Sequence, residues 1–161
     1  MKITVVAGVF AAGFAGGLFA GAHQKPAAPT LPVERVTGIG GVFFKADNPT
    51  ALRQWYQEKL GIAIHAQGTF SLFEWREPED ASRVGTTVWS VFPADTTYFA
   101  PSTAPFMLNY RVRDLDKMLA QLRAAGVRVD PKIADEFNGR FAWIIDPEGN
   151  KIELWEPEAG F

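Results

Sequence analysis

Residues 141–157 read FAWIIDPEGNKIELWEP and carry the strongest structural signal in the chain. The turn signal DPEGN at 146–150 separates two strand-forming runs, 139–145 and 151–156. Such a turn between two strands predicts that they pair with each other. This pair closes the second of two similar units.

Together with the residues that precede this pair, the sequence predicts two copies of one β-α-β-β-β unit. Each copy begins with a strand, 36–46 or 106–112, and continues into a helix that starts at a polar cap and stops at a glycine. Three short strands follow each helix, at 62–66, 69–75 and 86–92 in the first copy and at 127–129, 139–145 and 151–156 in the second. Because one helix covers only one face of such a unit, the predicted fold is α+β, with a curved mixed sheet around a cavity.

The alternation of side chains along each strand predicts which residues face that cavity. In the last strand the apolar Ile152 and Leu154 belong under the helix, so Glu153 and Trp155 point into the cavity. Aligning the last strands of the two copies pairs Trp89 with Glu153. The same alternation places further residues on the cavity face: Gly41, Phe43, Lys45, Met107, Asn109 and Arg111.

The doubled unit, the Trp55-Tyr56 and Leu60-Gly61 pairs that close the first helix, and the quoted ending resemble the vicinal oxygen chelate superfamily. That superfamily includes glyoxalases, bleomycin-resistance proteins and dioxygenases. The resemblance extends over almost all of 35–157 and implies a glyoxalase-like fold. The superfamily also contains epimerases and thiol transferases, so the resemblance leaves the reaction open.

The resemblance also implies positions for a metal. Members hold a divalent ion on side chains from the first and last strands of both units, where it polarises two vicinal oxygens of the substrate. In this sequence those positions fall at Gly41, Trp89, Met107 and Glu153. Only Glu153 suits a hard or borderline metal, because glycine has no side chain, an indole nitrogen only donates, and a thioether suits soft ions. We therefore expect neither a metal nor another cofactor.

The predicted cavity instead has the composition of a pocket for a flat or apolar small molecule. Its candidate ligand-binding residues are Phe43, Trp89, Met107, Asn109, Arg111 and Trp155. Glu153 is the candidate catalytic residue, as a general base or as the ligand of a weakly held metal, and its alternative role is an ion pair with Arg111 or Lys45. Two hypotheses remain, a metal-independent binding protein, which the missing ligands favour, and a lyase or dioxygenase.

The composition excludes several other classes. The chain has no cysteine and two histidines, which rules out disulfides, thiolate nucleophiles and a His-rich metal centre within one chain. Without a GxSxG motif, we interpret His65 as a strand or turn residue rather than a catalytic base. A net charge of −2 with interspersed signs offers no basic stripe for nucleic acid.

The N-terminal region predicts export. Residues 3–22 form an uncharged run rich in Ala, Gly, Val and Phe, and a small-residue sequence precedes His23, which is typical of a cleaved signal peptide. The predicted segment, 1–22, is thus a signal peptide, with a retained membrane anchor as the alternative. A proline-containing linker, 23–34, then leads to the domain at 35–157 and a tail at 158–161. The expected location is periplasmic or secreted, with membrane anchoring as the alternative.

Two further features stay open. The segment 93–102, which joins the two units, either folds over the mouth of the cavity or packs as an ordered crossover on the sheet edge, and the crossover is favoured. The second is the oligomeric state. We consider a homodimer, because members of this fold often build their cavities across two copies.

Overall fold

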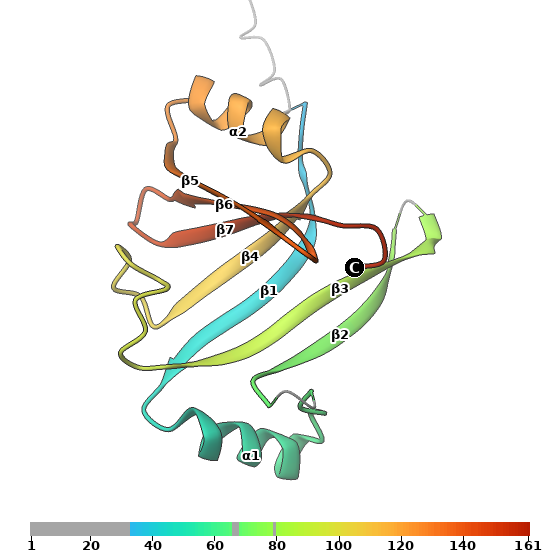
Figure 1. Cartoon of the computed structure of the whole chain (residues 1–161), viewed down its shortest axis with the longest axis vertical. Helices are drawn as coiled ribbons and strands as arrows, with labels where there is room; N and C mark the ends of the chain where they lie inside the picture. The colour runs from blue at the N-terminus through green and yellow to red at the C-terminus, as the bar shows by residue number, and fades with distance from the viewer. Residues whose placement is uncertain (1–32, 66–67, 79) are drawn as a thin grey trace, which may run out of the picture. The chain divides into compact units, whose positions relative to one another are not determined.

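A computed structural model describes residues 33–65, 68–78 and 80–161 of the chain. Seven strands in these ranges form one curved mixed sheet in the order β2-β3-β1-β4-β7-β6-β5, with two helices beside it (Figure 1). The elements are β1 Val36–Ala46, α1 Pro49–Leu60, β2 Phe70–Glu77, β3 Asp80–Pro93, β4 Phe106–Val112, α2 Leu115–Ala124, β5 Arg128–Glu136, β6 Gly139–Ile145 and β7 Lys151–Pro157. The predicted leader and nearly all of the predicted linker lie outside the described residues.

None of the helices in the described ranges has the length and apolar character needed to cross a membrane.

The sheet confirms the predicted α+β fold built from two similar units. β1 and β4 pair antiparallel at its centre, and each has a parallel neighbour, β3 beside β1 and β7 beside β4. The strand predicted at 62–66 is wrong over its described residues, 62–65, which form no strand. There the backbone N–H of His65 donates to the carbonyl of Phe70 at 2.8 Å. In the described chain, therefore, α1 is followed by two strands of its unit and α2 by three.

The two helices begin and end where the capping residues predict. Asn48 Oδ1 accepts from the backbone N–H of Ala51 at 3.0 Å, and Asp114 accepts from that of Lys117 at 2.9 Å. Gly61 ends α1 in the left-handed region at φ 69°, which a residue with a side chain adopts less easily.

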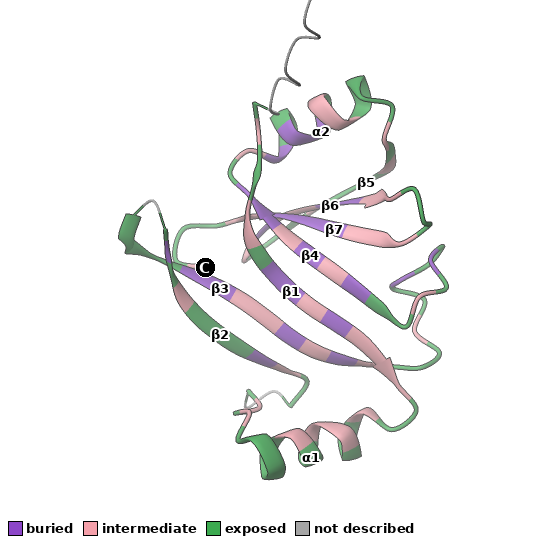
Figure 2. Ribbon diagram, turned by 180° about the vertical axis from the view of Figure 1, so that it is seen from behind, coloured by how far each residue is buried: buried purple, intermediate pink, exposed green. Residues whose placement is uncertain are grey.

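The two helices pack on the same face of the sheet but to different depths. Buried Leu115, Met118 and Leu119 of α2 pack against the sheet residues Val112, Ala142 and Leu154. α1 has no buried residue, and its Tyr56 ring lies 4.9 Å from the ring of Trp89 and 6.1 Å from that of Phe44. Figure 2 shows this contrast between the helices, and buried residues also lie along the middle of β1, β3 and β4.

We call the face that carries Phe44, Trp89 and Leu154 the helix face, and the opposite face the cavity face. A second apolar cluster lies on the cavity face and contains Phe43, Phe99, Met107 and Trp143. Both faces of the sheet therefore carry an apolar cluster. A site on the cavity face is surrounded by apolar side chains.

Candidate functional site

Glu153 of β7 lies on the cavity face and is 2% exposed. Its Oε1 accepts from Asn109 Nδ2 at 2.7 Å, and its Oε2 accepts from Trp143 Nε1 at 2.8 Å and from the hydroxyl of Tyr98. The ladder explains this convergence, because Asn109 and Trp143 lie opposite Glu153 on the neighbouring strands β4 and β6. Three donors therefore take up most of the accepting capacity of the carboxylate.

Tyr98 comes from the segment between the two units rather than from the sheet. Burial raises the pKa of Tyr98 well above its ordinary value, and the negative charge of Glu153 adds to this effect. The hydroxyl therefore stays protonated and acts as a donor. The neighbouring Phe99 is fully buried in the apolar cluster of the cavity face, so the segment is an ordered crossover, and its Tyr98 lines the cavity beside Glu153.

A cavity of about 240 Å³ opens beside Glu153. An apolar cavity of about 440 Å³ adjoins it, and the two share Phe70, Val88, Asn138 and Trp155. We call the two together the concave groove. Its walls are mainly aromatic, and Glu153 lies at one end while Phe161 lies at the other.

The structure brings four of the predicted site residues to this groove. Phe43, Asn109, Glu153 and Trp155 all line it, as side-chain alternation predicts. Met107 lies on the predicted face but is fully buried within the apolar cluster, so it supports the floor of the groove and does not line it.

The prediction that Trp89 faces the cavity is wrong. In the ladder Phe43, a cavity-face residue, lies opposite Ser90 of β3, and Gly41 lies opposite Val88. Trp89 alternates to the helix face, where its ring lies 5.3 Å from that of Phe44. Because Phe43 and Asn109 hold equivalent places in the two units, and Asn109 pairs with Glu153, the equivalent of Glu153 in the first unit is Ser90.

Arg111 lies on the predicted face but beneath the groove, at 2% exposure. Its guanidinium carbon is 4.9 Å from the ring centre of Trp155 and 5.7 Å from that of Trp75. It donates to the backbone oxygens of Thr86 at 3.4 Å and Phe161 at 2.9 Å. Burial lowers the pKa of Arg111 below its ordinary value, and the negative charge of Glu77 opposes this. Among the described residues no ion pair joins Glu153 to Arg111 or to Lys45, contrary to the alternative considered for Glu153.

Sequence reasoning missed several residues of the groove. The sequence could have indicated Trp143, because this residue lies opposite Glu153 in the predicted hairpin of 139–145 and 151–156. Tyr98 had no such signal, since its place depends on how the crossover packs. His65 lines the groove with an exposed ring stacked on Phe70 at 4.6 Å, and it lies outside the strands, between α1 and β2.

The sequence model of the Glyoxalase/Bleomycin resistance protein/Dioxygenase superfamily matches residues 38–154. The chain belongs to this superfamily. A comparison with curated protein sequences found no significant match.

Solved structures similar to this chain include two epimerases and a dioxygenase. Methylmalonyl-CoA epimerase from Mycobacterium tuberculosis is 22% identical with a TM-score of 0.52, over 81% of this chain and 94% of that one. A variant of the Streptomyces coelicolor methylmalonyl-CoA epimerase, in complex with 2-nitronate-propionyl-CoA, is 17% identical with a TM-score of 0.57, over 78% and 97%. An extradiol ring-cleaving dioxygenase from B. fuscum is 17% identical with a TM-score of 0.53, over 81% of this chain and 35% of that one. At these identities the likeness shows the shared fold.

The residues at the metal positions implied by the superfamily do not fit a metal. Gly41 has no side chain, Met107 is enclosed in the apolar cluster, and the first-unit position is Ser90 by the ladder instead of Trp89. Glu153, the one carboxylate, is held by three protein donors. The described ranges contain no cluster of three or more His, Cys, Asp and Glu side chains that could hold a metal ion.

Proposed function

We propose that this member of the superfamily binds a small aromatic or apolar molecule in the concave groove, without a metal centre. The observation that carries the proposal is the engagement of Glu153. A carboxylate that ligates a metal needs free lone pairs, whereas most of those on this one accept hydrogen bonds from Tyr98, Asn109 and Trp143. In this role Glu153 holds the crossover and three strands together at one end of the groove.

The walls of the groove support the choice of ligand. Phe70, Leu72, Val88 and Trp155 line the larger part, which is almost wholly apolar. Such a surface gains free energy when an apolar ligand replaces water, at about 25 cal/mol for each Å² buried. Flat rings have the additional advantage that they stack on aromatic side chains.

A lyase or dioxygenase activity that uses Glu153 as a metal ligand or general base is the alternative. Such chemistry would have to use the accepting position on Oε1 that the three donors leave, because Oε2 already accepts two hydrogen bonds and Oε1 one. The geometry therefore favours binding over this chemistry.

The proposal is tested with N-phenyl-1-naphthylamine, a neutral aromatic probe whose fluorescence rises in apolar surroundings. Leu72 and Phe73 provide a matched pair of variants, because they are neighbours on β2 with exposures of 44% and 46%. Leu72 lines the groove and lies opposite Val88, whereas Phe73 points to the other face. A charge in an apolar cavity is costly, so Leu72→Glu should weaken probe binding about tenfold, and Phe73→Glu should leave it nearly unchanged.

Saturable binding that only Leu72→Glu weakens would support the proposal. Equal affinities for wild type and both variants, or an absence of binding, would overturn it. Elemental analysis of the purified protein and of Glu153→Gln addresses the metal separately. We expect far less than one metal ion per chain in both, and stoichiometric metal that the variant loses would favour the enzyme.

We further propose that this binding takes place outside the cytoplasm. The support is the composition of 3–22 and the small residues before His23. Mass spectrometry of the protein isolated from its native host would test this. A mature chain beginning at His23 is expected, and an intact N-terminus in the cytoplasmic fraction would contradict it.

A further inference from the structure

Arg111 is a buried cation whose hydrogen bonds are incomplete. Within the described part of the chain, its Nε has no hydrogen-bond partner and its Nη2 donates only to the backbone oxygen of Phe161. Nε and Nη2 form one edge of the guanidinium, the edge that can hold both oxygens of a carboxylate side by side. One of the two donors on this edge, Nε, therefore has no acceptor.

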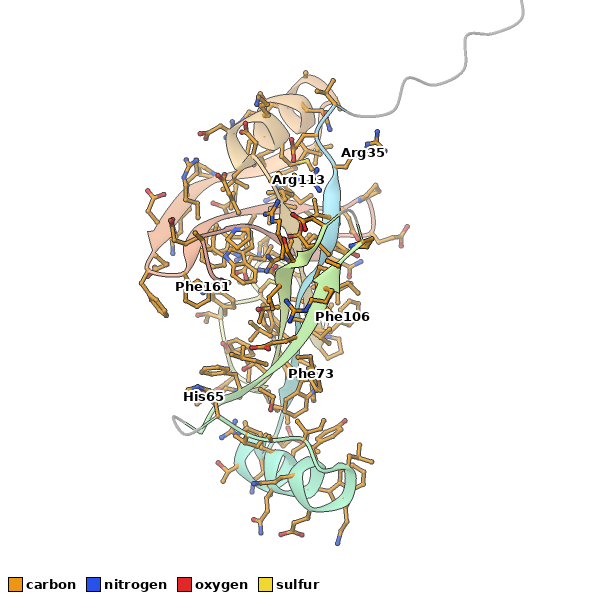
Figure 3. All side chains as sticks on the ribbon, turned by 90° about the vertical axis from the view of Figure 1, so that its right-hand side faces the viewer. Arg35, His65, Phe73, Phe106, Arg113 and Phe161 are labelled. Atoms are coloured by element: carbon orange, nitrogen blue, oxygen red, sulfur yellow. The ribbon has the colours of Figure 1, made fainter. Side chains whose placement is uncertain are left out.

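Phe161 shows what kind of molecule fits beside this edge. Its ring lines the apolar part of the concave groove and meets the ring of Phe137 at 5.8 Å in an edge-to-face contact, while its backbone oxygen lies 2.9 Å from Arg111 Nη2. In the edge-on view of Figure 3, Phe161 and His65 lie on one side of the strands and Phe106 on the other. The chain thus places an aromatic ring in the groove and an oxygen on a buried cation.

The charges around Arg111 also suit an anion. Glu77 and Arg83 are the charged groups that act on it, and they lie 3.6 Å apart from carboxylate to guanidinium. Their charges offset each other. The three side chains, counted without the backbone oxygen of Phe161, therefore carry one net positive charge, which a carboxylate bound in that oxygen's place would neutralise.

We propose that the concave groove binds an aromatic carboxylate, with the ring in its apolar part and both carboxylate oxygens on Nε and Nη2 of Arg111, in place of the backbone oxygen of Phe161. This inference rests on the proposed function and names its ligand class. Residues 158–161 then act as an internal competitor, because they occupy the same place. Arg111 supplies the specificity for the charge, and Trp155 covers the guanidinium that binds it.

The test compares 3-phenylpropionate with 3-phenylpropionamide, which has the same ring and chain but no charge. Calorimetry should find that wild type binds the acid about tenfold more tightly than the amide, as expected for a charge-assisted paired contact. Arg111→Gln should bring the two affinities together. Arg128→Gln, an exposed arginine on β5, should leave the preference unchanged.

A second variant keeps Arg111 and ends the chain at Pro157. Removal of the competitor should tighten binding of the acid more than binding of the amide. This variant decides the question if Arg111→Gln does not fold.

Equal affinities of acid and amide in wild type and in the shortened chain would overturn the inference. If both probes bind equally well, the proposed function stands without its anionic specificity. If neither these probes nor N-phenyl-1-naphthylamine binds, the proposed function fails as well.

Discussion

Tyr98→Phe is expected to destabilise the fold by releasing one of the three donors that hold Glu153. The change removes only the hydroxyl, and Glu153 keeps Asn109 and Trp143 as partners. A hydrogen bond to a charged group contributes about 1.5–3 kcal/mol to the free energy of unfolding. Tyr98 is 37% exposed, so water can partly replace the lost donor, and we expect a loss of about 1–2 kcal/mol.

Urea denaturation at pH 7 measures this loss directly. With a denaturant dependence of about 2 kcal/mol per molar urea, the midpoint should fall by about 0.5–1 M. Tyr110→Phe is the matched control, because Tyr110 packs against the cluster on the helix face and its hydroxyl has no hydrogen bond within the described ranges. Equal midpoints for Tyr98→Phe and wild type would refute the view that this contact holds the crossover.

The raised pKa of Tyr98 predicts a dependence on pH as well. The unfolded chain loses the Tyr98 proton near pH 10, whereas the folded chain keeps it. The contribution of Tyr98 is thus complete below pH 10 and declines as the pH rises above that value. Absorbance titration of the folded protein should therefore ionise equal numbers of tyrosines in wild type and Tyr98→Phe, and an additional ionisation near pH 10 in wild type would contradict this.

Three further changes test other parts of the fold. A Cβ at Gly40 would lie 2.1 Å from Asn109 Oδ1 and 2.9 Å from Trp155, so Gly40→Ala should cost about 1–3 kcal/mol of unfolding free energy and weaken probe binding; unchanged thermal stability would contradict this. Asp146 accepts from the side-chain amide of Asn150 and from two backbone N–H groups, which lowers its pKa, so Asp146→Asn should be less stable than wild type above about pH 4, with the gap closing in acid; a gap that persists in acid would exclude this cause. Leu119→Ala in the core below α2 should cost about 2–5 kcal/mol in urea denaturation, and a loss under about 1 kcal/mol would show that α2 is not essential to the core.

Side-chain alternation predicted the orientation of the site residues correctly in strands that are apolar on one face and polar on the other. In β7 the apolar Ile152 and Leu154 alternate with Glu153, so the carboxylate had to leave the helix face, and the structure agrees. β3 offers no such contrast, because Val88, Trp89 and Val91 are apolar on both faces. The sequence alignment of the two units was therefore displaced by one residue in β3. The pairing of β1 with β3 in the structure corrects it.

The remaining parts of the site depend on contacts between distant segments. Tyr98 reaches Glu153 because the neighbouring Phe99 is buried under the cavity face, which no local pattern in 93–102 indicates. Arg111 was predicted on the correct face, but its depth follows from Gly40, against which its Cγ and the ring of Trp155 pack. The sequence could therefore predict to which face of the sheet a strand side chain points. The contacts between distant strands and loops required the structure.

The central claim, that the concave groove binds an aromatic molecule without a metal, is tested most directly by one calorimetric measurement. N-phenyl-1-naphthylamine is titrated into the protein after treatment with a chelator, and again after addition of one equivalent of Zn²⁺ or Mn²⁺. We predict one binding site per chain with the same affinity under all conditions. Binding that appears only with a metal, or no binding at all, would contradict the claim.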